Sequence, residues 1–170
     1  MIFDVLKQQW LRKECIRLGN SSRDQQRYWP ESLVVVFNAD QFDDLEVFKK
    51  WCGKLDISSN KMTLLGYTKN VKKKYLEGAT LFDPSAIKWK GGVKDDHLSE
   101  LLNSKYDLQI NYYEVSSQIK KFITMSLNSS IKVGYATHEE ITYDLAVNVP
   151  LTNQELFISE IAKYLKIFNP

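Results

Sequence analysis

Glycine and proline are scarce in this sequence. Together they make up 11 of 170 residues (7 Gly and 4 Pro), whereas an average protein contains roughly 12% of the two. Collagen-like and low-complexity chains need far more of both, and glycine-rich phosphate-binding loops are poorly supplied. The shortage therefore excludes fibrous and low-complexity classes.

Cysteine is equally rare. Cys15 and Cys52 stand 37 positions apart in segments predicted to be helical, a spacing typical of neither a disulfide framework nor a metal site. We expect a reducing, cytoplasmic setting, with both thiols as small buried apolar groups rather than nucleophiles. No signal peptide is expected either, because Asp4 and Lys7 interrupt the first apolar residues.

Long apolar runs and an excess of one charge are also missing. The longest uncharged stretches, such as 33–39 and 145–154, reach at most ten residues, which cannot cross roughly 30 Å of hydrocarbon. We therefore expect no transmembrane segment. The balance of 23 basic and 21 acidic residues, a net charge of +2, makes nucleic acid an unlikely partner. The basic segment around Lys69 and Lys72–Lys74 is interpreted as a solvated loop.

What the sequence does contain is enough apolar material for one core, with 44% hydrophobic and 12% aromatic residues. Residues 33–37, LVVVF, form a continuous β-branched and aromatic run, which is typical of a strand covered on both faces. Apolar residues at helical spacing follow over 45–55, and a second strand is predicted at 62–67. This order of elements predicts a βαβ unit with a right-handed crossover.

Alternation of strands and helices continues to the end of the chain. Further strands are predicted at 79–82, 108–112, 131–134 and 145–149, while residues 68–94 are the least regular. The pattern predicts an α/β fold, a three-layer sandwich with a mainly parallel, Rossmann-like sheet of five or six strands. Seven apolar strand residues should be buried in this one sheet: Val34, Val36, Leu64, Leu108, Ile110, Val133 and Val147.

An additional N-terminal helix is predicted over residues 2–18. With the polar linker that follows, it forms a segment 1–30 ahead of a single α/β domain, 31–170. Ile2, Leu6 and Trp10 share one side of this helix, but Lys13 and Arg17 continue that side. We therefore expect the helix to pack only through its first half, outside the βαβ core. Because apolar and basic residues are not on opposite faces, the sequence does not favour docking of this helix on a membrane.

Sites for common cofactors are not found. The turn after the first strand reads NADQFDD, without the glycines that bring backbone close to a pyrophosphate and with carboxylates that repel phosphate. The Walker-type and GxSxG motifs are absent as well. Asp40, Asp43 and Asp44 could hold Mg²⁺, but we favour helix capping. We expect no cofactor and no metal.

A candidate ligand site follows from the rule that open α/β sheets bind ligands beyond the carboxyl ends of their strands, at a topological switch point. Asparagine donates and accepts hydrogen bonds, and tyrosine combines an apolar ring with a polar tip, so the residues leaving these ends suit a small polar ligand. The alternative is a set of ordinary surface loops, with His138 as an exposed loop histidine without a role. The candidate residues are Asn38, Asp40, Asn111, Tyr112, Tyr135 and His138.

A resemblance is carried by YDLQINYYEVSSQIKKFITMSLNSSIKVGY and the later YDLAVNV. Its marks are two strand entries at 106–108 and 143–145, the strand 131–134, and the closing helix 157–165. Over residues 106–165 the chain resembles a family of small uncharacterised α/β proteins from Bacteroidetes, a domain of unknown function. The resemblance implies a cytoplasmic bacterial α/β protein and transfers no catalytic residue.

A similar strand, helix and VG pattern occurs in glycosyltransferases of the heptosyltransferase kind, which are much longer and have two Rossmann-like halves. At 170 residues this chain could hold only one such half.

The sequence therefore leads to two hypotheses about function. The first is a non-catalytic module that binds an unknown small molecule or protein partner. The alternative is a small transferase or hydrolase that acts on an anionic metabolite at the carboxyl edge of the sheet.

Overall fold

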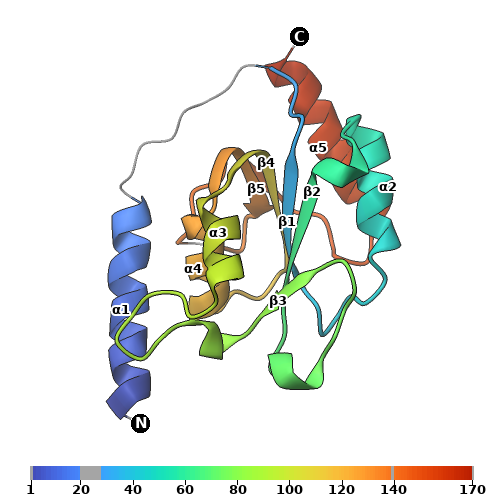
Figure 1. Ribbon diagram of the computed structural model, residues 1–170. Helices are drawn as coiled ribbons and strands as arrows, with labels where there is room; N and C mark the ends of the chain where they lie inside the picture. Colours follow the sequence, from blue (N-terminus) through green and yellow to red (C-terminus); the bar gives the residue numbers. More distant parts are fainter. Residues whose placement is uncertain (1, 20–27, 139, 170) are drawn as a thin grey trace.

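The computed structural model describes residues 2–19, 28–138 and 140–169 (Figure 1). Most of the predicted linker, residues 20–27, lies outside this part of the chain. The helices are α1 (Ile2–Gly19), α2 (Glu46–Leu55), α3 (Asp96–Asn103), α4 (Gln118–Ser126) and α5 (Gln154–Phe168). The strands are β1 (Leu33–Asn38), β2 (Met62–Tyr67), β3 (Thr80–Phe82), β4 (Lys105–Tyr112), β5 (Asn128–Tyr135) and β6 (Leu145–Val147). Short 3-10 helices are η1 (Ser59–Lys61), η2 (Val71–Lys73) and η3 (Pro84–Ala86).

The six strands form one sheet in the order β3-β2-β1-β4-β5-β6, and every neighbouring pair is parallel. This is the order of a doubly wound Rossmann fold. The predicted α/β fold with a parallel sheet is therefore confirmed. The strand order reverses between β1 and β4, so the topological switch point lies where these two strands end, at Asn38 and Tyr112.

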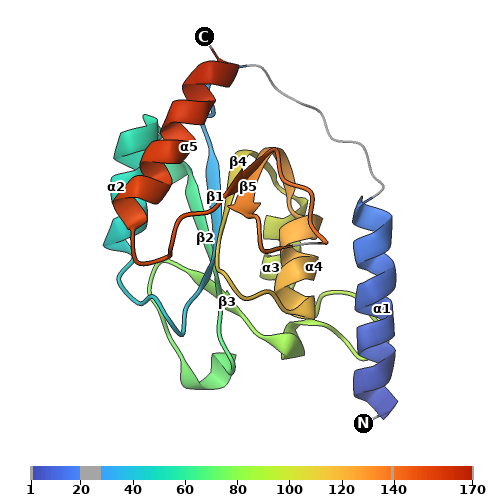
Figure 2. The same ribbon diagram turned by 180° about the vertical axis from the view of Figure 1, so that it is seen from behind.

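Helices cover both faces of the sheet, with α2 and α5 on one side and α3 and α4 on the other (Figures 1 and 2). The buried run in β1 supplies both layers, because Leu33, Val35 and Phe37 pack with α2 and α5 while Val34 and Val36 pack beneath α3 and α4. All seven apolar residues that the sequence assigns to the sheet interior are buried.

Helix α1 lies outside α4 and packs through its second half. Leu11 and Cys15 are buried in the same apolar cluster as Phe122 of α4, whereas Ile2 and Leu6 are 74% and 42% exposed. The expectation of packing through the first half is therefore wrong. The inward stripe begins at Trp10 and continues through Leu11 to Cys15, so the helix turns its first apolar residues outward.

The irregular segment between 68 and 94 is held by short turns. After β3, Ile87 and Val93 form an antiparallel bridge, and Lys88 N donates to Gly92 O at 2.9 Å. Gly91 and Gly92 have φ of +96° and +86°, which only glycine adopts readily. Gly91 also lets α1 approach, because a Cβ there would lie 2.4 Å from Trp10 Nε1. We call residues 87–93 the tryptophan turn, after Trp89 at its tip.

Candidate functional site

The crevice between the ends of β1 and β4 is filled by the protein's own side chains. Tyr112 is fully buried and its hydroxyl donates to Leu151 O. Its ring lies 5.2 Å from that of Phe42 and 4.9 Å from those of Trp51 and Phe157. Burial raises the pKa of Tyr112 well above its usual range. This phenol is therefore a core hydrogen-bond donor and not an acid or base near neutral pH.

Asn111 lies on the opposite face of the sheet, beneath α4. It is fully buried; its Nδ2 donates to Val133 O at 2.9 Å, and its Oδ1 accepts from Gln109 Nε2 at 2.9 Å. Both ends of the amide are thus used within the chain. Asn111 and Tyr112 are adjacent in sequence but separated by the sheet, as the alternation of strand side chains requires.

Asn111 belongs to a buried polar network that the sequence analysis missed. Gln109 Nε2 also donates to Thr124 O at 2.8 Å, Ser129 Oγ donates to Gln109 Oε1, and Lys132 Nζ donates to Thr124 O at 3.2 Å. The network joins β4 and β5 to α4. Its hydrogen bonds offset the free-energy cost of burying these polar groups. Polar residues inside two predicted strands were its only signal in the sequence.

His138 is buried, with 4% of its surface exposed. Its ring stacks on Tyr113 with centroids 4.5 Å apart, and its Nδ1 lies 2.6 Å from the hydroxyl of Tyr143. The expectation of an exposed loop histidine is therefore wrong, because the two tyrosine rings enclose it. Burial lowers the pKa of His138, so its imidazole is neutral at pH 7.

Tyr135 is also buried, but on the α5 side. Its ring stacks on Phe157 at 5.5 Å and lies 6.3 Å from that of Tyr112. Tyr135 also lies 6.1 Å from the ring of His138, so the structure brings Tyr112, Tyr135 and His138 together in a row of buried rings. Asn111 lies beneath α4, apart from Tyr112 and Tyr135.

Asn38 and Asp40 stay near the surface and organise the loops beyond β1 and β2. Asp40 accepts from Thr68 Oγ1 at 2.7 Å and from Lys69 N at 2.9 Å, while Asn38 Oδ1 accepts from Asp40 N at 3.0 Å. Partial burial raises the pKa of Asp40, but the two hydrogen bonds outweigh it and bring the pKa below its usual range. Across the described residues, no three His, Cys, Asp or Glu side chains gather as a metal site would require.

Lysines and carboxylates both lie on the accessible surface beyond the carboxyl ends of β1, β2 and β3; the exposed carboxylates there are Asp40, Asp43, Asp44, Glu77, Asp95 and Asp96. Two contacts link the loops of these strands, since Val71 N donates to Asp83 Oδ2 at 2.9 Å and Lys7 Nζ donates to Pro84 O at 2.7 Å. The loop with η2 and the first turns of α1 therefore flank the same turn at 83–84. We call this surface the lysine edge; its lysines are Lys7, Lys69, Lys72, Lys73, Lys74, Lys88, Lys90 and Lys94.

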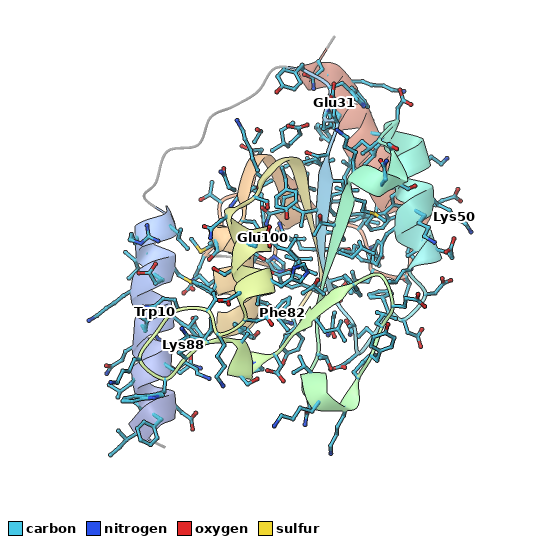
Figure 3. All side chains as sticks on the ribbon, in the orientation of Figure 1. Trp10, Glu31, Lys50, Phe82, Lys88 and Glu100 are labelled. Carbon is cyan, nitrogen blue, oxygen red and sulfur yellow. The ribbon has the colours of Figure 1, made fainter. Side chains whose placement is uncertain are left out.

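A hollow of about 300 Å³ opens on the lysine edge between α1 and the tryptophan turn. Four lysines and one carboxylate, Asp4, line it, together with Phe3 and Trp89, whose rings meet edge to face at 5.0 Å. Lys90 Nζ lies 4.8 Å above the Trp89 ring. Figure 3 shows Lys88 beside α1 and close to Trp10. The negative face of an aromatic ring attracts cations, as the Trp89 ring attracts Lys90, so only the ammonium groups of this hollow suit an anionic group. In the sequence, the only sign of this hollow was the pattern Lys-Trp-Lys.

A second hollow, of about 270 Å³, lies between the edge strand β6 and α5. Its lining includes Leu156, Glu160 and Tyr164 and contains no lysine or arginine. It therefore does not share the chemistry of the lysine edge.

Fold and surface together define an α/β protein of Rossmann strand order, with buried polar groups at its switch point and a charged, lysine-bearing surface at the carboxyl edge of β1–β3. The chain belongs to a family of unknown function, DUF6913, which it matches over residues 7–168. No curated protein and no solved structure matches it. The family confirms the resemblance to a domain of unknown function and extends it beyond residues 106–165.

Proposed function

We propose that this protein is a non-catalytic binding module and that its lysine edge binds an anionic ligand or partner. The observation that carries the proposal is the hollow that four lysines line together with one carboxylate, Asp4, and the paired rings of Phe3 and Trp89. Six of the eight lysines of this edge are exposed, and Lys7 and Lys74 are half-buried.

The buried state of the other candidate groups favours binding over catalysis. Tyr112 and Asn111 are fully buried and hydrogen bonded within the chain, and His138 is enclosed by tyrosine rings. A transferase or hydrolase would need such groups to reach its substrate. Asp40 is exposed, but its carboxylate holds the loop at Lys69. The free, buried thiols of Cys15 and Cys52 support a reducing, cytoplasmic setting.

Retention on heparin-agarose tests the proposal, because heparin is a sulfated polyanion and the resin contains no lipid. We expect a variant with Lys72, Lys73, Lys88 and Lys90 changed to Gln to elute at roughly 0.1 M lower NaCl than the native chain, because salt screens exposed charges. The matched control changes four exposed lysines that lie off this edge, Lys50, Lys61, Lys163 and Lys166.

Both variants lose four charges, so net charge alone would shift them equally. Figure 3 places Lys50 on α2, across the molecule from Lys88. Equal elution of the two variants would overturn the proposal, and circular dichroism checks that both are folded.

A further inference from the structure

We infer that the anionic partner is the surface of a negatively charged lipid bilayer, an inference that rests on the proposed function. The argument starts at the outer side of α1. Ile2, Val5 and Leu6 are 74%, 56% and 42% exposed, while Leu11 and Cys15 hold the helix against α4. The first turns of the helix therefore expose apolar side chains on the outer side, while Leu11 and Cys15 pack on the inner side.

The tryptophan turn adds a second exposed apolar group next to this helix. Trp89 is 47% exposed and Phe3 is 61% exposed, and their contact at 5.0 Å joins the turn to the first turn of α1. Lys88 and Lys90 flank the tryptophan directly in sequence. Tryptophan and lysine side chains both suit the headgroup region of a bilayer, because each combines an apolar part with a polar end that stays in contact with water.

A third exposed group lies on the loop with η2. Tyr75 is 86% exposed and follows Lys72, Lys73 and Lys74. The N-terminal end of α1 and the green segment with η2 lie at the same end of the molecule in Figure 1, and Figure 2 shows the same arrangement from behind. A small ligand in the hollow would contact α1 and the tryptophan turn, whereas a bilayer surface is broad enough to contact the loop with η2 as well.

The chemistry of these groups favours lipid over nucleic acid. Ile2, Val5 and Leu6 offer no flat ring on which a base could stack, and the lysine edge contains no arginine to pair with base edges or phosphates in a fork. Aliphatic side chains can instead enter the boundary between headgroups and acyl chains. Stable binding of a protein to a membrane surface requires two contributions. Here these are the insertion of apolar side chains and the attraction between lysines and anionic headgroups.

The sequence did not favour membrane docking because the apolar and basic residues of α1 do not lie on opposite faces. In the structure, basic residues from outside α1 lie beside its exposed apolar residues, so this objection no longer holds. Lys88 and Lys90 of the tryptophan turn and Lys94 after it lie next to the first turns of α1, together with Lys7 of the helix itself. Among the described residues, no helix is long and apolar enough to cross a bilayer, so the proposed contact is with the surface only.

Vesicle sedimentation with the full chain tests this inference. We expect binding to phosphatidylcholine vesicles that contain phosphatidylglycerol, and at least about tenfold weaker binding to pure phosphatidylcholine. The variant Lys72→Gln, Lys73→Gln, Lys88→Gln, Lys90→Gln should lose about tenfold on the anionic vesicles. The control with Lys50, Lys61, Lys163 and Lys166 changed to Gln should bind like the native chain.

A second variant, Ile2→Ser with Leu6→Ser, separates lipid from other polyanions. Both side chains are exposed, so the variant should keep its fold and its retention on heparin while losing about tenfold in vesicle affinity. Native retention on heparin without any vesicle binding would overturn the lipid surface and leave the proposed function standing. If the native chain binds neither heparin nor anionic vesicles, both the lipid surface and the proposed function are overturned.

Two other results would overturn the lipid bilayer as the partner and assign a different one. Tighter binding to single-stranded oligothymidine than to anionic vesicles at equal ionic strength would assign the edge to nucleic acid. A dimer in vesicle-free solution that Ile2→Ser with Leu6→Ser dissociates would assign the outer face of α1 to a second copy of the chain.

Discussion

Gly134 leaves the space that the ring of Tyr143 occupies above β5. A Cβ at this position would lie 2.1 Å from Tyr143 Cζ. Gly134→Ala should therefore push the ring away and lower the free energy of unfolding by roughly 1–3 kcal/mol, as measured by urea denaturation. Gly53→Ala is the matched control, since Gly53 lies in α2 with nothing within 4 Å of its added Cβ. That change should stabilise the protein by up to about 1 kcal/mol. A Gly134→Ala variant as stable as the native chain would contradict the packing described.

Burial of His138 makes the stability of the protein depend on pH. Burial is the main cause of its lowered pKa, and the charge of Lys120 lowers the pKa further. The unfolded chain takes up a proton near pH 6.5, while folded His138 takes it up only at lower pH. The free energy of unfolding should therefore be highest above about pH 6.5 and fall as the pH decreases through the folded pKa.

Urea midpoints at pH 7.5 and 5.5 measure this effect, and His138→Gln should reduce the difference between them. Exposed His97 provides the control, and His97→Gln should keep the native pH dependence. Carboxylates whose pKa is lowered, such as Asp40 and Asp83, act in a separate range near pH 4 and below. If the pH dependence survives in His138→Gln, another group must cause it.

Among the elements, α1 is an addition whose inner side nevertheless contributes to the core. The sheet and helices α2–α5 lie within residues 33–168, so we predict that deleting residues 1–20 leaves a folded domain. The deletion uncovers the part of α4 on which Leu11 packs. It should lower the free energy of unfolding by at least about 2 kcal/mol, the scale of one buried leucine.

Near-ultraviolet circular dichroism checks this prediction, because it reports fixed aromatic packing. A truncated chain that keeps helical far-ultraviolet signal but loses the near-ultraviolet signal would show that α1 is required for the core. The result would also decide whether the chain folds without α1.

For the molecule as a whole, the sheet could be predicted from the sequence and the site could not. The run LVVVF gave β1 because continuous β-branched residues fit a strand covered on both faces. The orientation of α1 escaped prediction, because apolar residues on two sides of a helix do not say which side meets the core.

The candidate site was less predictable because strand position alone does not determine exposure. Asn111 and Tyr112 stand at the carboxyl end of β4 as expected, but helices and the loop at Leu151 cover them. The hollow beside Trp89 depends on contact between α1 and a turn about 85 residues later in the chain. No local pattern records such a contact.

The central ladder between β1 and β4 also affects how the chain can fold. One half of the sheet, β1–β3, comes from residues 33–82, and the other, β4–β6, from residues 105–147. Leu33 pairs with Leu108, 75 positions further on. Contacts between such distant residues require a large loop to close first and slow the search for the native state. Since Val35 and Ile110 meet along this ladder in the middle of the core, neither half can complete its apolar interior before the other has arrived.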